Sequence, residues 1–160
     1  TPDGGEVPFS LVAVVNPGRG FASIKRVDRR RAINVTAAVD AGRQVFDAIG
    51  CATCHVPSLM TGPNSNPLFD RQPVPLFSDL LLHDIGTGDG IGQAEAAPEE
   101  IRTPALWGLR HRRPLLHDGS APTVAHAIER HAEEAELARR GVDQLSPADL
   151  AALLAFLDSL

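Results

Sequence analysis

The chain of 160 residues contains two cysteines, and both stand in the segment Cys51-Ala52-Thr53-Cys54-His55. This C-x-x-C-H spacing is typical of c-type haem attachment. Thiols three residues apart on one helical turn can form thioethers to both vinyl groups of the macrocycle, and the imidazole that follows can bind the iron. The sequence therefore predicts one covalently attached haem c, held by Cys51 and Cys54, with His55 as an axial ligand.

Two other uses of a cysteine pair fit the residues less well. A structural zinc ion needs four ligands, and the chain has no second cysteine pair or His-x-x-His cluster to complete the set. A redox-active dithiol of the thioredoxin type would follow a strand in a βαβ unit, whereas Cys51 follows a helical pattern and Cys54 precedes a proline-rich loop. Haem attachment is therefore the favoured chemistry.

Two segments predict helices that position the motif. Apolar residues recur at three- and four-residue spacing from Thr36 until Gly50 ends the pattern. Near the end of the chain, Ser146 and Asp149 form a capping box with a proline at the first helical position. Gly42 leaves room for another helix to pass closely, so we expect the C-terminal helix to cross the first helix there.

The rest of the sequence predicts a third helix and long loops. The third helix is expected from Pro122 to Arg140, with Gly141 as its stop signal. About 45 residues, from Val56 to Glu100, are rich in proline and glycine and predict an irregular loop that wraps a cofactor. Within it, the alternating glycines from 86 to 92 are interpreted as a turn, because no strand precedes them and no helix follows.

Together these elements predict a mainly α fold, a cytochrome c-like helical domain over residues 36–160 wrapped around one covalent haem, with long irregular loops. A crossed helix pair with C-x-x-C-H after the first helix is the arrangement of class I cytochromes c. Residues 1–35 are expected to be an N-terminal extension or the remnant of a preceding segment, in extended or loop structure with turns at Pro17-Gly18 and Gly20.

The second axial position of the iron decides between electron transfer and catalysis. Its candidate ligands are Met60, His83, His111, His117, His126 and His131. On a continuous third helix, Val124, Ile128 and His131 share one apolar stripe. His126 points to the opposite, solvated face. A histidine within an apolar stripe must find a partner, which for His131 is either the iron or a backbone carbonyl.

Five motifs occur in a specific order along residues 40–160. They are Cys51-x-x-Cys54-His55, Ser78-Asp79-Leu80-Leu81-Leu82-His83-Asp84-Ile85-Gly86, Arg102-Thr103-Pro104-Ala105-Leu106-Trp107-Gly108-Leu109, Leu116-His117-Asp118-Gly119-Ser120-Ala121 and Phe156-Leu157-x-Ser159-Leu160. The set resembles the C-terminal haem domain of the di-haem oxidoreductases, also called thiol oxidoreductases, which are related to bacterial di-haem cytochrome c peroxidases.

The resemblance implies a particular second ligand. In the related peroxidases a methionine fourteen residues after the histidine of the His-Asp-Gly motif binds the iron, and in the di-haem oxidoreductases a histidine stands there. In this chain the position is His131, fourteen residues after His117. His117 is then interpreted as part of a structural turn. Arg102 is expected to bond a haem propionate, with a surface ion pair as the alternative, and Trp107 is expected to pack near the macrocycle.

Composition and motif count limit the function. The net charge of −5 is unsuited to a phosphate backbone, and no stretch approaches the roughly 18 apolar residues that span a bilayer. The relatives carry two C-x-x-C-H motifs and this chain carries one. We therefore expect a mono-haem c-type cytochrome domain that carries single electrons through a bis-histidine haem. The alternatives are the electron-storing or catalytic half of a peroxidase-like di-haem oxidoreductase and a sensory haem module.

Attachment of haem c takes place outside the cytoplasm, so the expected location is the periplasm or the cell exterior. The expected partner is a redox protein, with a basic one favoured by the acidic net charge, or a second haem domain.

Overall fold

The computed structural model describes residues 24–27, 30–33 and 36–160, and contacts divide them into two units that meet between Thr36 and Ala37. In the first unit, strand β1 (Ile24–Val27) pairs antiparallel with β2 (Arg30–Ile33). The turns expected at Pro17-Gly18 and Gly20 lie outside the described residues.

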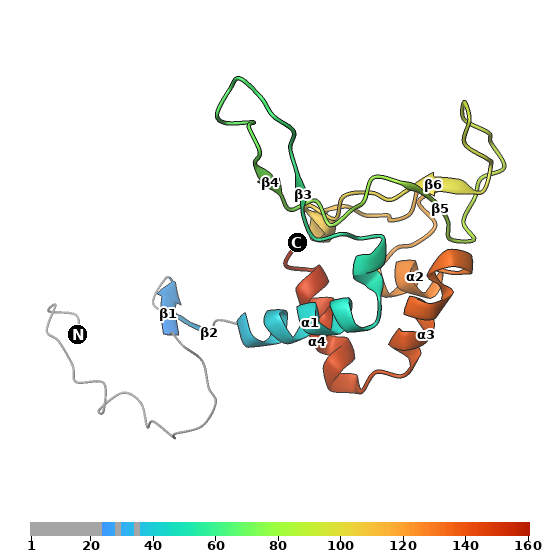
Figure 1. Cartoon of the computed structure of the whole chain (residues 1–160). Helices are drawn as coiled ribbons and strands as arrows, with labels where there is room; N and C mark the ends of the chain where they lie inside the picture. Colours follow the sequence, from blue (N-terminus) through green and yellow to red (C-terminus); the bar gives the residue numbers. More distant parts are fainter. Residues whose placement is uncertain (1–23, 28–29, 34–35) are drawn as a thin grey trace, which may run out of the picture. The chain divides into compact units, whose positions relative to one another are not determined.

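The second unit contains the helices and the remaining short strands (Figure 1). Its elements are α1 (Thr36–Ala48), η2 (Cys51–Thr53), β3 (Leu59–Met60), β4 (Pro73–Val74), β5 (Leu82–Asp84), β6 (Glu100–Arg102), η3 (Leu109–His111), α2 (Val124–Glu129), η4 (Glu133–Ala135), α3 (Glu136–Asp143) and α4 (Pro147–Leu157). Strands β3 and β5 pair antiparallel with β4 and β6, respectively. Among the described helices, none is long and apolar enough to cross a membrane.

The expectation of a mainly α, cytochrome c-like domain is wrong. The α-helices of the second unit have 13, 6, 8 and 11 residues, and between η2 and α2 the described chain forms turns, two strand pairs and the single turn η3. This stretch is rich in proline and glycine, which disfavour helix because proline lacks a backbone N–H and glycine loses more conformational entropy. Loops and short strand pairs therefore form much of the domain.

The expected single helix from Pro122 to Arg140 is also wrong. Helix α2 ends at Glu129, and the backbone N–H of Ala132 donates to the carbonyl of Ile85 at 3.0 Å instead of continuing the helix. A second helix, α3, begins at Glu136. Gly141 lies inside α3 and does not end it. A Cβ atom at Gly141 would lie 2.9 Å from Cβ of Ile49, so this glycine lets α3 pack closely on the segment after α1.

The crossing of the first and last helices is confirmed. A Cβ atom at Gly42 would lie 1.9 Å from the carbonyl oxygen of Ala152 in α4, so only glycine permits the backbones to approach this closely. Figure 1 shows α1 in cyan crossing α4 in red. Ser146 caps α4, because its side chain accepts a hydrogen bond from the backbone N–H of Asp149, as the capping box predicts.

An apolar cluster connects this crossing to the C-x-x-C-H motif. Its buried members are Phe46, Phe77, Leu106, Leu109, Val124, Leu153, Phe156 and Leu157. The ring of Phe156 lies 5.4 Å from that of Phe46 and 5.7 Å from that of Phe77, in tilted edge arrangements favoured by aromatic pairs. The cluster fixes the end of α1 against the loop that contains Phe77, and the motif begins at that end.

We expect Gly42→Ala to lower the free energy of unfolding by about 1–3 kcal/mol or more, because the added methyl group overpacks the helix crossing. Gly62→Ala is the matched control, since a Cβ at Gly62 meets nothing within 4 Å. Denaturant melts of the two variants measure the difference. Equal stability of both would show that the crossing at Gly42 is not tightly packed.

Candidate functional site

The C-x-x-C-H motif forms a tight turn immediately after α1. Gly50 has a φ of 91°, a left-handed conformation that glycine adopts without strain and that turns the chain from α1 into η2. The backbone N–H of His55 donates to the carbonyl of Cys51 at 3.0 Å. Residues three apart on such a turn lie on the same side, so Cys51 and Cys54 are suited to one planar partner. Both cysteines are free and partly buried.

The environment of these thiols does not favour dithiol chemistry. Burial raises the pKa of Cys51 to about 11 and also raises the pKa of Cys54. Redox-active cysteine pairs instead have a lowered pKa, because the thiolate is the reacting form. At neutral pH both sulfur atoms therefore remain protonated, and the thioredoxin-type alternative lacks its chemical requirement.

The imidazole of His55 is held in one tautomer by the backbone. Its Nδ1 donates to the carbonyl of Phe77 at 3.0 Å, which leaves Nε2 unprotonated. Burial lowers the pKa of His55 to about 4, so the ring is neutral at physiological pH. The ring packs 6.3 Å from that of Phe46. His55 thus offers a fixed nitrogen lone pair, which is what a metal ligand requires.

The imidazole of His131 is also held by a backbone carbonyl, from another part of the chain. His131 follows the end of α2, where its backbone N–H donates to Ile128 at 3.0 Å and its Nδ1 donates to the carbonyl of Ala127 at 2.6 Å. Burial lowers the pKa of His131, which keeps the ring neutral at physiological pH. A backbone carbonyl and the iron were considered above as alternative partners of His131. Both are compatible with this geometry, because the carbonyl bonds Nδ1 and the iron would bond Nε2.

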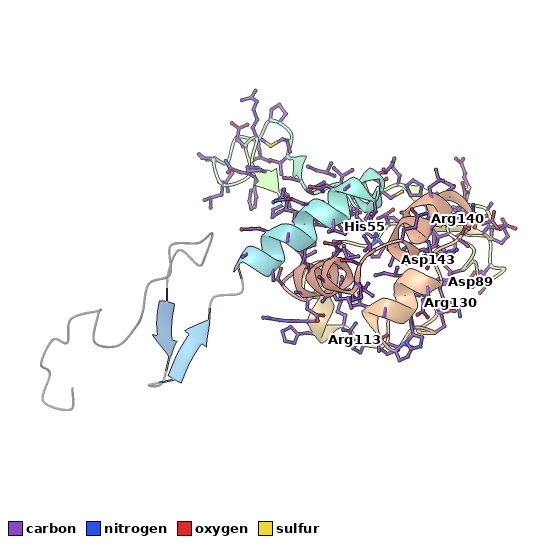
Figure 2. The ribbon with its side chains drawn as sticks, turned by 90° about the horizontal axis from the view of Figure 1, so that it is seen from below. His55, Asp89, Arg113, Arg130, Arg140 and Asp143 are labelled. Atoms are coloured by element: carbon purple, nitrogen blue, oxygen red, sulfur yellow. The ribbon has the colours of Figure 1, made fainter. Side chains whose placement is uncertain are left out.

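The two imidazoles lie at a distance from each other that fits two ligands of one metal ion. Their ring centres are 6.5 Å apart with the planes inclined by 45°. A metal–imidazole bond is about 2 Å long, so two imidazoles on one ion have centres about 6 Å apart. Among the described residues, neither Nε2 has a hydrogen-bond partner. Figure 2 shows His55 where α1 approaches the orange helices of the C-terminal part.

The structure distinguishes these two histidines from the nearest other candidate. His83 bonds carboxylates through both ring nitrogens, with Nε2 at 2.8 Å from Asp79 and Nδ1 at 2.9 Å from Glu134. Glu134 first and then Asp79 raise the pKa of His83, which favours the doubly protonated ring without a lone pair. The thiol of Cys54 lies 3.9 Å from Nδ1 of His83, so Cys54, Asp79 and His83 are close enough to hold a metal ion. The nitrogens of His83 are instead bonded to the two carboxylates.

The other candidates lie in solvent or at turns. Met60 on β3 is 63% exposed. His126 is exposed, as expected, and its Nδ1 lies 2.7 Å from the hydroxyl of Thr123. His111 is exposed beside Arg110. His117 is exposed in a turn. Asp118 holds this turn by accepting hydrogen bonds from the backbone N–H and the hydroxyl of Ser120, as expected of a structural turn.

Arg102 and Trp107 both lie at the surface. Arg102 is exposed on β6, where its backbone pairs with that of Leu82. Trp107 is 49% exposed, and its indole N–H donates to the carbonyl of Pro75. Their expected contacts with a haem propionate and with the macrocycle stay predictions.

The sequence analysis missed the residues that join the His131 segment to the rest of the site. Glu134 accepts hydrogen bonds from the backbone N–H of Asp84 at 3.0 Å and from His83. These residues are about 50 positions apart. Glu134 was expected on an ordinary helix, so no local pattern indicated its partners.

A pair of thiols beside one neutral imidazole, with a second neutral imidazole nearby, fits a site that holds haem. The family model described as di-haem oxidoreductase, putative peroxidase, matches residues 19–160. The chain belongs to this family, as the five sequence motifs indicated, and its cofactor chemistry is that of a haem oxidoreductase. No match was found among curated proteins or among solved structures.

In the chain without haem, acidification from pH 6.5 to pH 4 is expected to lower the free energy of unfolding. In the unfolded chain, His55 and His131 take up protons near the ordinary histidine pKa of 6.5, whereas burial holds the pKa of folded His55 at about 4 and lowers the pKa of His131. The unfolded state therefore binds more protons in this window, and stability is lost as the pH falls through it.

Denaturant melts across this pH range measure the effect. His131→Leu should flatten the pH dependence, whereas His126→Leu, at an exposed position, should leave it unchanged. Identical slopes in the two variants would show that burial of His131 has no part in the pH dependence.

Proposed function

We propose that the chain binds one haem c through thioethers to Cys51 and Cys54, with His55 and His131 as axial ligands, and that it carries single electrons. The observation that carries the proposal is the pair of neutral imidazoles with ring centres 6.5 Å apart. Each has its Nδ1 bonded to a backbone carbonyl. Metal-binding histidines characteristically donate the other ring N–H in this way, because the bond fixes the ring and raises the basicity of the ligating nitrogen.

Two imidazole ligands favour electron transfer over catalysis at this centre. When bound, haem supplies a one-electron iron couple, and the protein sets its potential through the axial ligands. If haem is bound, His55 and His131 would both hold its iron and would leave no site on it for peroxide. Both rings are partly buried, and each is held by a backbone carbonyl. Imidazole in place of the thioether of a His/Met cytochrome also lowers the reduction potential.

A second candidate function rests on the family. Its description names two haems, whereas this chain contains one C-x-x-C-H motif. In this second function the domain would store an electron for a catalytic haem in another domain, or would become catalytic itself if His131 left the iron. The partner of a domain with this second function would be another haem domain. The partner of a single-electron carrier would be a redox protein, and the net charge of −5 favours a basic one. The proposed location is the periplasm or the cell exterior for both.

Haem is expected to stay attached in acid and denaturant, because thioether bonds survive unfolding. The intact mass should exceed that of the chain by about one haem. Cys51→Ala combined with Cys54→Ala should abolish retention, whereas Thr53→Ala, at the exposed position between them, should preserve it. Mass spectrometry and haem staining after denaturation provide the readouts. A colourless native chain with two free thiols would refute the attachment.

The ferric protein is expected to be six-coordinate and low-spin. His131→Gly should convert it to a high-spin form that binds cyanide, while His126→Gly should leave the spectrum unchanged because His126 is exposed on α2. Absorption and electron paramagnetic resonance spectra report the change. A wild-type spectrum that is already high-spin, with ready cyanide binding, would contradict the closed centre and support the catalytic alternative.

A further inference from the structure

The turn that contains His131 is attached to the end of β5 and to Ile85, the residue after it, by three contacts. The backbone N–H of Ala132 donates to the carbonyl of Ile85 at 3.0 Å. One carboxylate oxygen of Glu134 accepts a hydrogen bond from the backbone N–H of Asp84 at 3.0 Å, and the other accepts one from Nδ1 of His83 at 2.9 Å. The backbone of Ala132 and the side chain of Glu134 thus fix the residues that follow His131 to one short segment.

The same contacts continue to the other side of the site. Nε2 of His83 bonds the carboxylate of Asp79 at 2.8 Å, and the backbone N–H of Asp79 donates to the carbonyl of Cys54 at 2.8 Å. The side chains of His83 and Asp79 are 17% and 12% exposed, so the inner bond is largely shielded from water. A chain of hydrogen bonds therefore runs from the C-x-x-C-H turn to the turn that contains His131.

The backbone of that turn needs such support. Glu133 has a φ of 45°, a left-handed conformation that a residue with a Cβ adopts only when its surroundings hold it. Ala132 packs against Gly86, where an added Cβ would lie 3.0 Å from that of Ala132. The side-chain bonds of Glu134 to His83 and Asp84 help to hold the turn in this conformation. Without them, we expect the turn to relax toward backbone angles that Glu133 prefers.

We propose that Asp79, His83 and Glu134, called here the carboxylate clamp, position His131 and so keep the second axial site of the iron closed. The three are positioning residues that act through His131. This inference rests on the proposed function, because it takes His131 as an iron ligand. It adds a reason why the ligand stays in place, and it makes release of the clamp a route to an open iron.

Glu134→Ala removes the clamp at its exposed end and is expected to raise the rate of cyanide binding to the ferric haem by about tenfold or more, with a larger high-spin fraction. A hydrogen bond to a charged group contributes to an equilibrium by about that factor. Glu134→Gln is expected to restore most of the wild-type behaviour. Its amide oxygen still accepts from Asp84, and its amide N–H can donate to neutral His83.

Glu129→Ala is the matched control, because it removes an exposed carboxylate at the end of α2, two residues before His131. Its spectrum and cyanide rate should equal those of the wild type. If Glu134→Ala does not load haem, His83→Ala tests the clamp with the same measurements and should show the same opening. A clamp variant that stays low-spin with the control's cyanide rate would overturn the inference.

His131→Gly separates the inference from the proposed function. If His131→Gly opens the iron and Glu134→Ala does not, the ligand assignment stands and the clamp is refuted. If His131→Gly leaves the wild-type spectrum unchanged, the ligand assignment fails and the clamp fails with it. Opening by both, with rescue by Glu134→Gln, supports the clamp, since a general loss of stability would not respond to the amide.

Discussion

The structure of the site depends on two hydrogen bonds from imidazole N–H groups to backbone carbonyls, His55 to Phe77 and His131 to Ala127. Each bond fixes the tautomer of a buried ring, so that Nε2 keeps its lone pair. Burial alone favours neutral rings but would leave their orientation free. With both Nδ1 atoms bonded, the ring centres lie 6.5 Å apart, and no other described residue bonds the remaining nitrogens.

The fold supplies these carbonyls by interrupting regular structure. In a continuous helix the carbonyl of Ala127 would accept the backbone N–H of His131, four residues later. Because α2 ends at Glu129, that N–H instead bonds Ile128, and the carbonyl of Ala127 can accept the side chain. The break is maintained by the contacts of Ala132 with Ile85 and of Glu134 with the end of β5. The end of α2 at Glu129 is therefore what frees a carbonyl to hold the ring of His131.

Local features of the sequence predicted local features of the structure. The capping box at Ser146 and the crossing at Gly42 were predicted because capping and close helix approach leave marks within a few residues. The mainly helical fold and the continuous third helix were wrong for the opposite reason. The bonds that end α2 come from Ile85 and Asp84, about 50 residues away, and no periodicity within the helix reports them. The helix-face argument for His131 as a ligand assumed a helix that in fact ends at Glu129. The spacing from His117 indicated the same residue without that assumption.

A crystal structure of the haem-loaded chain tests the central claim most directly, because it observes both ring nitrogens of each histidine at once. The account predicts iron bound to Nε2 of His55 and Nε2 of His131, with the Nδ1 atoms still within hydrogen-bond distance of the carbonyls of Phe77 and Ala127. A ring of His131 turned away from the iron, with water or another side chain in its place, would contradict it.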